Sequence, residues 1–207
     1  MSVEEAPTLR ERQAEQVARE IRLAFIGLVN SKGPNGFSLR DVATEAGVSE
    51  RTLYRYYPNR EELVRGIHAN ENAAMEEQLR PMRSQVADLS DPEIIARVFE
   101  VFEEHEELVK ASGLLQSSGV DQGRSVERTE EIRRVVAATP DVADEVVPQL
   151  VGLVRAISSS AGWMRMTGSD VGLDSKEAGY AAQWALEVLL EAARDETGPL
   201  RPRGRTS

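Results

Sequence analysis

The sequence contains no cysteine and only two histidines. Without cysteine the chain can form no disulfide, no thiolate metal site and no cysteine nucleophile. The two histidines, His68 and His105, are far apart in the sequence and lack the spacing of metal ligands, so we expect no metal ion. The sequence also has no phosphate-binding loop and no Gly-x-Ser-x-Gly turn. An enzyme is therefore disfavoured, and we expect no cofactor.

Long hydrophobic runs are absent as well. No stretch approaches the roughly 18 apolar residues that a membrane-spanning helix requires. Residues 1–16 are polar and acidic, unlike a secretory signal, so we expect a cytoplasmic protein with no membrane partner. Alternating strand patterns and internal repeats are also missing. The sequence therefore predicts an all-α fold.

The net charge of −10 is unevenly distributed along the chain. Residues 1–66 hold ten basic and ten acidic side chains, so this part is neutral. Residues 67–207 hold fifteen basic and twenty-five acidic side chains and carry the whole excess. This asymmetry indicates two domains with different partners, the second of which phosphate groups would repel.

Capping signals and apolar spacing predict four helices in the first third of the chain. Apolar residues recur at helical spacing along residues 14–29. A capping box that begins at Ser38 opens a short second helix, which Gly47 ends. Ser49 begins a third helix, and Asn59 caps a long fourth helix that reaches about residue 83.

The remainder of the chain also favours helices. Starts are expected at Asp91-Pro92, near Ser125 and at Asp141. A capping box at Asp174 opens a final helix that runs to about residue 196. Residues 113–124, with three glycines and several polar residues, indicate either a loop or a broken helix, and Pro148 either kinks or begins its helix.

Two short helices that meet at residues 47–49 have the spacing of a helix-turn-helix. Apolar residues on both helices would hold them together, with Leu53 and Tyr57 in the core. The second helix would enter the major groove of DNA and expose arginine, threonine and tyrosine. Arginine can donate two hydrogen bonds to guanine, and the hydroxyls can bind phosphate.

The run from Phe37 to Ile67 resembles the DNA-binding segment of the tetracycline-repressor (TetR) family. The resemblance covers about residues 10–66 and is most specific from Thr52 to Leu63, TLYRYYPNREEL. It implies a DNA-binding domain over residues 1–66 and a helical ligand-binding and dimerisation domain over residues 67–196. Composition predicts a disordered basic tail over residues 197–207.

The resemblance also implies which side chains contact DNA. A recognition surface would lie on the second helix of the motif, with phosphate contacts on either side of it. Tyr56 could instead pack on the first helix, and Arg40 could be a solvated surface charge. Glu50 is interpreted as a cap residue, with acceptance of a hydrogen bond from cytosine as the alternative. The predicted DNA-binding residues are Ser38, Arg40, Arg51, Thr52, Tyr54, Arg55, Tyr56 and Arg60.

In the second domain, apolar stripes predict two further surfaces. The last helix has a wider apolar stripe than one neighbouring helix would cover, which favours a four-helix bundle between two subunits. The alternative is a helix pair buried within one subunit. The predicted interface residues are Val154, Ile157, Ala161, Ala181, Ala185, Val188, Leu189 and Ala192. The candidate pocket residues, which could equally be core, are Phe99, Phe102, His105, Val109, Leu115, Trp163 and Met164.

The resulting hypothesis is a homodimeric transcriptional repressor. Its two recognition helices would read a palindromic operator with half-sites roughly 34–36 Å apart. An unidentified small molecule in the second domain would favour a state that releases DNA. One alternative is an activator, since the position of the operator decides whether binding raises or lowers transcription. Another is a protein-interaction module that has lost DNA binding.

Overall fold

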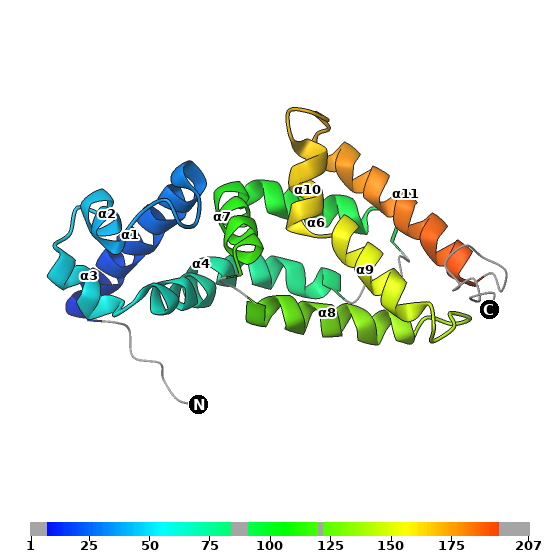
Figure 1. Ribbon diagram of the computed structural model, residues 1–207, viewed down its shortest axis with the longest axis horizontal. Helices are drawn as coiled ribbons and strands as arrows, with labels where there is room; N and C mark the ends of the chain where they lie inside the picture. The colour runs from blue at the N-terminus through cyan, green and yellow to red at the C-terminus, as the bar shows by residue number, and fades with distance from the viewer. Residues whose placement is uncertain (1–7, 84–90, 120–121, 195–207) are drawn as a thin grey trace, which may run out of the picture. The chain divides into compact units, whose positions relative to one another are not determined.

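The computed structural model describes residues 8–83, 91–119 and 122–194, and every regular element within these ranges is an α-helix (Figure 1). The all-α prediction is confirmed. The predicted tail, residues 197–207, lies outside the described residues. In chain order the helices are α1 (Leu9–Lys32), α2 (Leu39–Glu45), α3 (Glu50–Tyr56), α4 (Arg60–Arg83), α6 (Ile94–Glu104), α7 (Glu106–Ser117), α8 (Gln122–Ala137), α9 (Val147–Ile157), α10 (Ser160–Thr167) and α11 (Ser175–Arg194).

The chain forms two compact units, Met1–Ala73 and Ala74–Ser207. The domain boundary expected after residue 66 remains a prediction, and the two compact units divide after Ala73. This division falls within α4, so one continuous helix supplies residues to both units. Within the described ranges, no helix is both long enough and apolar enough to cross a membrane.

The first unit has a core built on α1. Ile21, Phe25 and Val29 are fully buried along one face of this helix, at the spacing of four residues that brings side chains onto one side. Val42 and Ala43 of α2 and Leu53 of α3 are also buried, as are three apolar residues of α4. α1 contacts α2, and α2 contacts α3. This packing holds the two short helices in place.

Most of the predicted helix starts are confirmed. The side chain of Asn59 accepts a hydrogen bond from the backbone N–H of Glu62 (2.9 Å) at the start of α4. Asp174 and Glu177 form the predicted reciprocal pair before α11, with distances of 2.7 and 3.1 Å. α1 begins earlier than expected because Thr8 and Glu11 form a capping box ahead of the apolar stripe.

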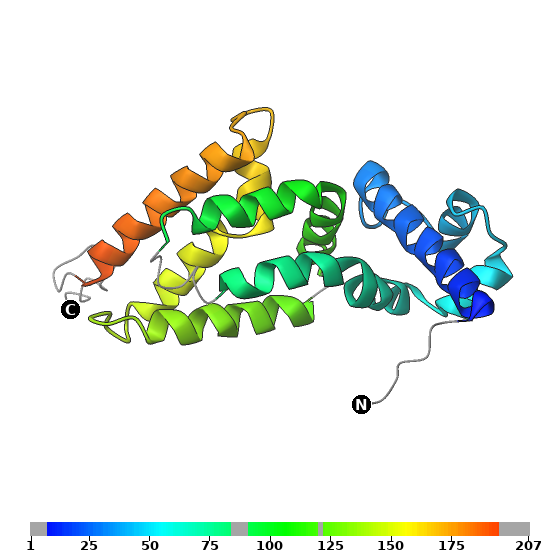
Figure 2. The same ribbon diagram turned by 180° about the vertical axis from the view of Figure 1, so that it is seen from behind.

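The second unit is a bundle around an apolar core to which α6, α9 and α11 contribute. α11 packs closely against α6, since a Cβ at Gly179 would lie 2.2 Å from Cα of Ala96. α9 lies beside both α8 and α11 (Figures 1 and 2). Pro148 lies in the first turn of α9, which confirms that it begins the helix.

Two predictions for the second unit are corrected or sharpened by the structure. No helix starts at Asp141, because this residue has φ of 65° in a turn, and α9 begins at Val147. Residues 113–124 are not one continuous loop, because residues 113–117 belong to α7 and residues 122–124 belong to α8. The small residues 158–162 that follow α9 do not extend it, because a new helix, α10, is capped by Ser159.

Candidate nucleic-acid interface

α2 and α3 begin with side-chain caps, which explains why such short helices form. The backbone N–H and hydroxyl of Ser38 donate to the Asp41 carboxylate (2.8 and 2.7 Å), and the Asp41 N–H donates back to the Ser38 hydroxyl (3.3 Å). These bonds from the Ser38 backbone and hydroxyl hold the pKa of Asp41 below its ordinary value. Ser49 caps α3 by accepting from the backbone N–H of Thr52 (3.1 Å).

A tight turn joins α2 to α3. Gly47 has φ of 66°, a backbone conformation that costs glycine little and other residues more. The backbone N–H of Val48 then donates to the carbonyl of Ala43 (2.9 Å), which folds the chain back on α2. Val42, Ala43 and Leu53 are buried between the helices. Two short helices joined in this way form the predicted helix-turn-helix.

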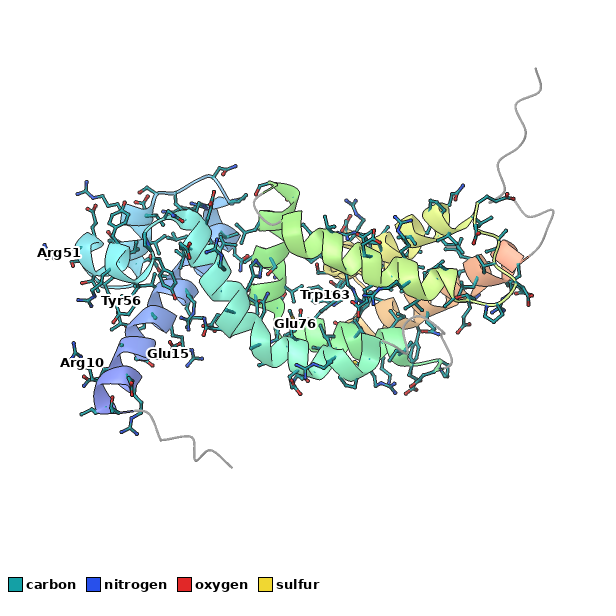
Figure 3. All side chains as sticks on the ribbon, turned by 90° about the horizontal axis from the view of Figure 1, so that it is seen from below. Arg10, Glu15, Arg51, Tyr56, Glu76 and Trp163 are labelled. Atoms are coloured by element: carbon teal, nitrogen blue, oxygen red, sulfur yellow. The ribbon has the colours of Figure 1, made fainter. Side chains whose placement is uncertain are left out.

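The side chains of α3 divide between a buried and an exposed side. Leu53 is fully buried and Tyr57 nearly so, which confirms their assignment to the core. Arg51 and Arg55 are exposed, and Tyr54 is a large side chain left 46% exposed. Figure 3 shows Arg51 pointing outward from α3. The exposed side therefore presents two guanidinium groups and a phenol, groups that can donate to base edges and phosphates.

Several residues of α3 have partners within the protein. Arg40 of α2 forms an exposed ion pair with Glu50 (3.3 Å), so Glu50 holds Arg40 beside the start of α3. The Thr52 hydroxyl shares a hydrogen bond with the Ser49 hydroxyl (2.9 Å). The Arg55 guanidinium carbon lies 5.1 Å from the ring centre of half-buried Tyr56. An exposed ion pair such as Arg40–Glu50 is weak, and the contact of Arg40 with DNA remains a prediction.

Arg60 has a structural role that the sequence did not indicate. Its guanidinium carbon lies 4.8 Å from the ring centre of Phe25 and 4.6 Å from that of Phe37, and it donates to the carbonyl of Pro34. Burial lowers the pKa of Arg60, although an arginine stays charged at neutral pH. Arg60, at the start of α4, thus contacts both α1 and the loop between α1 and α2. Its contact with phosphate remains a prediction.

The candidate pocket residues lie mostly in the core of the second unit. Phe99 and Phe102 are stacked with ring centres 5.9 Å apart, and Phe102 meets Trp163 edge-on at 6.1 Å. The indole N–H of Trp163 donates to the buried Ser175 hydroxyl (3.0 Å). Figure 3 shows Trp163 inside the second unit. Val109 and Leu115 are also buried, whereas Met164 is half-buried and His105 shares a hydrogen bond with Gln78 (3.0 Å).

The candidate dimer residues lie on different surfaces. Val154 belongs to the core of its own unit. Ala161, Ala181 and Val188 are exposed, and Ile157, Ala185, Leu189 and Ala192 are half-buried. The core side of α11 instead consists of Ala178, Ala182, Leu186, Leu190 and Ala193.

Three side chains that sequence reasoning missed are prominent in the structure. Tyr180 and Trp184 of α11 are exposed and lie four residues apart, on the same side as Val188. This spacing could have been read from the sequence. Arg22 is buried in the first unit. Its position in the sequence indicates this burial, because it lies next to Ile21 and three residues before Phe25 in the apolar stripe of α1.

No group of three or more histidine, aspartate or glutamate side chains that could hold a metal ion occurs within the described ranges.

Residues 26–67 match the sequence model of the bacterial regulatory proteins of the tetR family. No curated protein matches the chain significantly. The matched segment runs from α1 through α2 and α3 into α4 and contains the whole helix-turn-helix. The predicted resemblance is confirmed for this segment, which matches the tetR family of bacterial regulatory proteins, and the chain is a DNA-binding transcriptional regulator.

Proposed function

We propose that this regulator is a homodimeric repressor that binds a palindromic operator through α3 and leaves it when a small molecule binds the second unit. The observation that carries the proposal is that α3 has one buried apolar side and one exposed side with basic and aromatic residues. Its buried side is fixed by Leu53, while its exposed side presents Arg51, Tyr54 and Arg55. A helix held in this way can enter the major groove without losing its own packing.

The exposed apolar side of α11 supports a dimer. Tyr180, Trp184 and Val188 are 39%, 68% and 48% exposed and follow one another at intervals of four residues. Large apolar groups gathered on one helix side are typical of a surface that another protein covers. A second copy of the chain would cover the same side of its own α11, as a two-fold symmetric interface requires.

The aromatic core of the second unit supports a small-molecule effector. Phe99, Phe102 and Trp163 form a contiguous aromatic cluster whose polar handle, the Trp163 indole N–H, already has a partner in Ser175. An apolar molecule that inserts beside these rings would have to displace them. A ligand that binds better to such a displaced state shifts the protein toward it, and DNA affinity falls by the ratio of the two ligand affinities.

Operator binding by the full chain tests the first part of the proposal. Fluorescence anisotropy with duplexes from the DNA upstream of the gene should detect binding that is sequence-specific and weakens with salt. Arg51→Ala should reduce discrimination between the operator and a scrambled duplex by about 1–3 kcal/mol, because a guanine contact is lost. Arg19→Ala, an exposed arginine on α1, is the charge-matched control and should leave discrimination unchanged.

Two outcomes would contradict this assignment. One is that no upstream fragment binds better than a scrambled duplex at any salt concentration. The other is that Arg51→Ala and Arg19→Ala have equal effects on discrimination, which would mean that α3 does not read base edges.

A further inference from the structure

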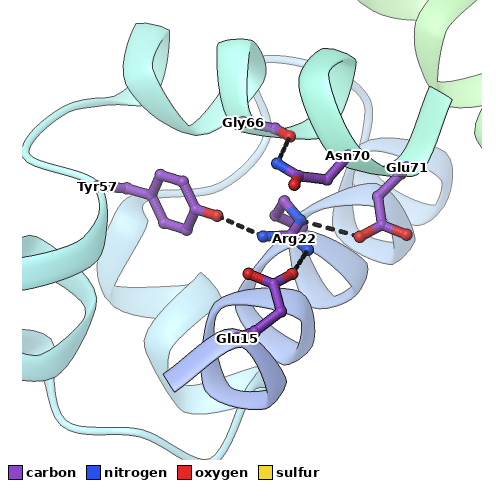
Figure 4. Close-up of polar contacts among 6 residues, drawn as sticks. All are labelled: Glu15, Arg22, Tyr57, Gly66, Asn70 and Glu71. Carbon is purple, nitrogen blue, oxygen red and sulfur yellow. Dashed lines mark hydrogen bonds and ion pairs between the residues drawn. The ribbon is translucent and has the colours of Figure 1, made fainter. Parts of the chain in front are cut away.

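Arg22 of α1 is a charged side chain that lies almost completely inside the first unit, with 2% of it exposed. Its guanidinium donates to three partners, as Figure 4 shows. Nη1 donates to the hydroxyl of Tyr57 (2.8 Å), Nε to Oε1 of Glu71 (2.9 Å) and Nη2 to Oε1 of Glu15 (2.6 Å). A buried charge is tolerated only with such partners, because an unpaired one would lose its hydration without compensation.

The three partners come from three different elements. Glu15 lies on α1 itself, Tyr57 is the C-cap residue that directly follows α3, and Glu71 lies on α4. Burial by itself lowers the pKa of Arg22, but the hydrogen bonds with Glu15, Tyr57 and Glu71 outweigh it and raise the pKa above the ordinary value. The guanidinium is therefore a permanent charge that joins the end of the DNA-reading helix to α4.

The ring of Tyr57 is held from a second side by α4. A Cβ at Gly66 would lie 2.6 Å from Cε1 of Tyr57, so only glycine allows the ring to approach α4 this closely. The backbone N–H of Tyr57 also donates to the carbonyl of Leu53 (2.8 Å), which closes the last turn of α3. The C-terminal end of α3 is thus fixed between Gly66 and Arg22.

We propose that Arg22 is a positioning residue for DNA recognition, which sets the orientation of α3 through Tyr57 and makes that orientation depend on α4 through Glu71. The proposal rests on the proposed use of α3 to read the operator. Arg22 and Tyr57 are buried, so neither offers a surface to DNA. α4 continues beyond Ala73 into the second unit, so a displacement of Glu71 along this helix would reach α3 through one guanidinium.

Tyr57→Phe in the full chain is the central test, because it keeps the ring against Gly66 and removes only the hydroxyl that Arg22 binds. Affinity is measured by anisotropy well below the melting temperature of both proteins. We expect operator affinity to fall about tenfold, the equivalent of roughly 1.4 kcal/mol. Affinity for a scrambled duplex and the slope of affinity against salt should stay unchanged, because no phosphate contact is lost.

Two alanine variants separate positioning from stability. Glu71→Ala and Glu15→Ala each remove one carboxylate from Arg22 and change the charge equally. Of these two carboxylates, Glu71 is the one that lies on another helix. Glu71→Ala should therefore lower operator affinity by about the same factor as Tyr57→Phe. Glu15→Ala should bind the operator like the unmodified chain, because Glu15 and Arg22 belong to the same helix.

The outcomes distinguish this proposal from the one on which it rests. If the unmodified chain does not prefer its operator, the proposed use of α3 fails and this proposal fails with it. If the unmodified chain prefers the operator and Tyr57→Phe binds it equally well, only the role of Arg22 is overturned. The same conclusion follows if Glu15→Ala and Glu71→Ala lose equal operator affinity, or if a variant loses equal affinity for operator and scrambled DNA. Arg22 and its partners would then stabilise the fold without positioning α3.

Discussion

At the scale of single residues, Arg60 gives the most direct prediction about stability. Its guanidinium carbon lies 4.8 Å and 4.6 Å from the ring centres of Phe25 and Phe37, and the group donates to the carbonyl of Pro34. Arg60→Ala should lower the free energy of unfolding by about 1–2 kcal/mol, because a half-buried cation–π contact and its apolar stem are lost. Urea denaturation followed by circular dichroism measures this change.

Two further variants separate the packing of Arg60 from its charge. Arg65→Ala, on the same helix, removes an exposed arginine that pairs with Glu62 and should cost about 0.5 kcal/mol or less. Arg60→Lys keeps the positive charge but not the planar guanidinium that contacts both rings, so it should lose stability while retaining attraction to phosphate. Equal stability of Arg60→Ala and Arg65→Ala would contradict the structural role.

At this scale, the burial of apolar residues is easier to predict from the sequence than the contacts of polar side chains. Leu53 and Tyr57 are predictable as core because helical spacing places them opposite the exposed arginines. Arg60 and Arg22 are not, because a long flexible side chain can reach solvent, phosphate or a buried partner from the same backbone position. Only tertiary contacts decide between these destinations.

At the scale of helices, the chain is most predictable where a start is encoded locally. Ser38 with Asp41 and Asp174 with Glu177 form caps as expected, since both partners lie within one turn of helix. The break at His105 was missed, because apolar residues on both sides continue the pattern of a single helix. Such breaks are set by packing between helices, which a local pattern does not contain.

The cap of α2 makes the stability of the first unit depend on pH. Hydrogen bonds from Ser38 hold the pKa of Asp41 below its ordinary value in the folded state, whereas the unfolded chain has a pKa of about 3.9. Asp41 therefore stabilises the fold above that pH, and this contribution is lost as the pH falls through the lower folded-state pKa. Asp41→Asn should lower the melting temperature at pH 7, and this difference should shrink in acid.

Glu45→Gln is the control for this experiment, because it removes a carboxylate from the end of α2 where no cap depends on it. It should not lower the melting temperature at pH 7. A difference between Asp41→Asn and the unmodified chain that stays constant from pH 7 into acid would show that the Asp41 carboxylate is not responsible.

At the scale of the whole molecule, α11 illustrates how far an apolar pattern can be interpreted. Apolar residues surround so much of this helix that periodicity alone cannot separate its core side from an exposed one. The structure places Leu186 and Leu190 in the core and leaves Val188 and Trp184 exposed. The division depends on where α6 and α9 lie, so it becomes visible only in three dimensions.

The exposed side of α11 gives the prediction that concerns assembly. Trp184→Ser should weaken the proposed dimer about 30-fold, because a buried tryptophan at the centre of an interface contributes about 2 kcal/mol or more. Sedimentation velocity of the full chain over a range of concentrations measures the dissociation constant. Affinity for a palindromic duplex should fall with it, while affinity for a single half-site stays constant.

Val171→Ser is the matched control, because Val171 is another exposed apolar residue of the second unit but lies in the loop before α11. It should leave both the dissociation constant and operator affinity unchanged. If Trp184→Ser sediments like the unmodified chain at every concentration, this side of α11 is not the surface that joins two copies. If the unmodified chain is itself monomeric at micromolar concentration, the palindromic operator loses its structural basis, since one recognition helix reads only one half-site.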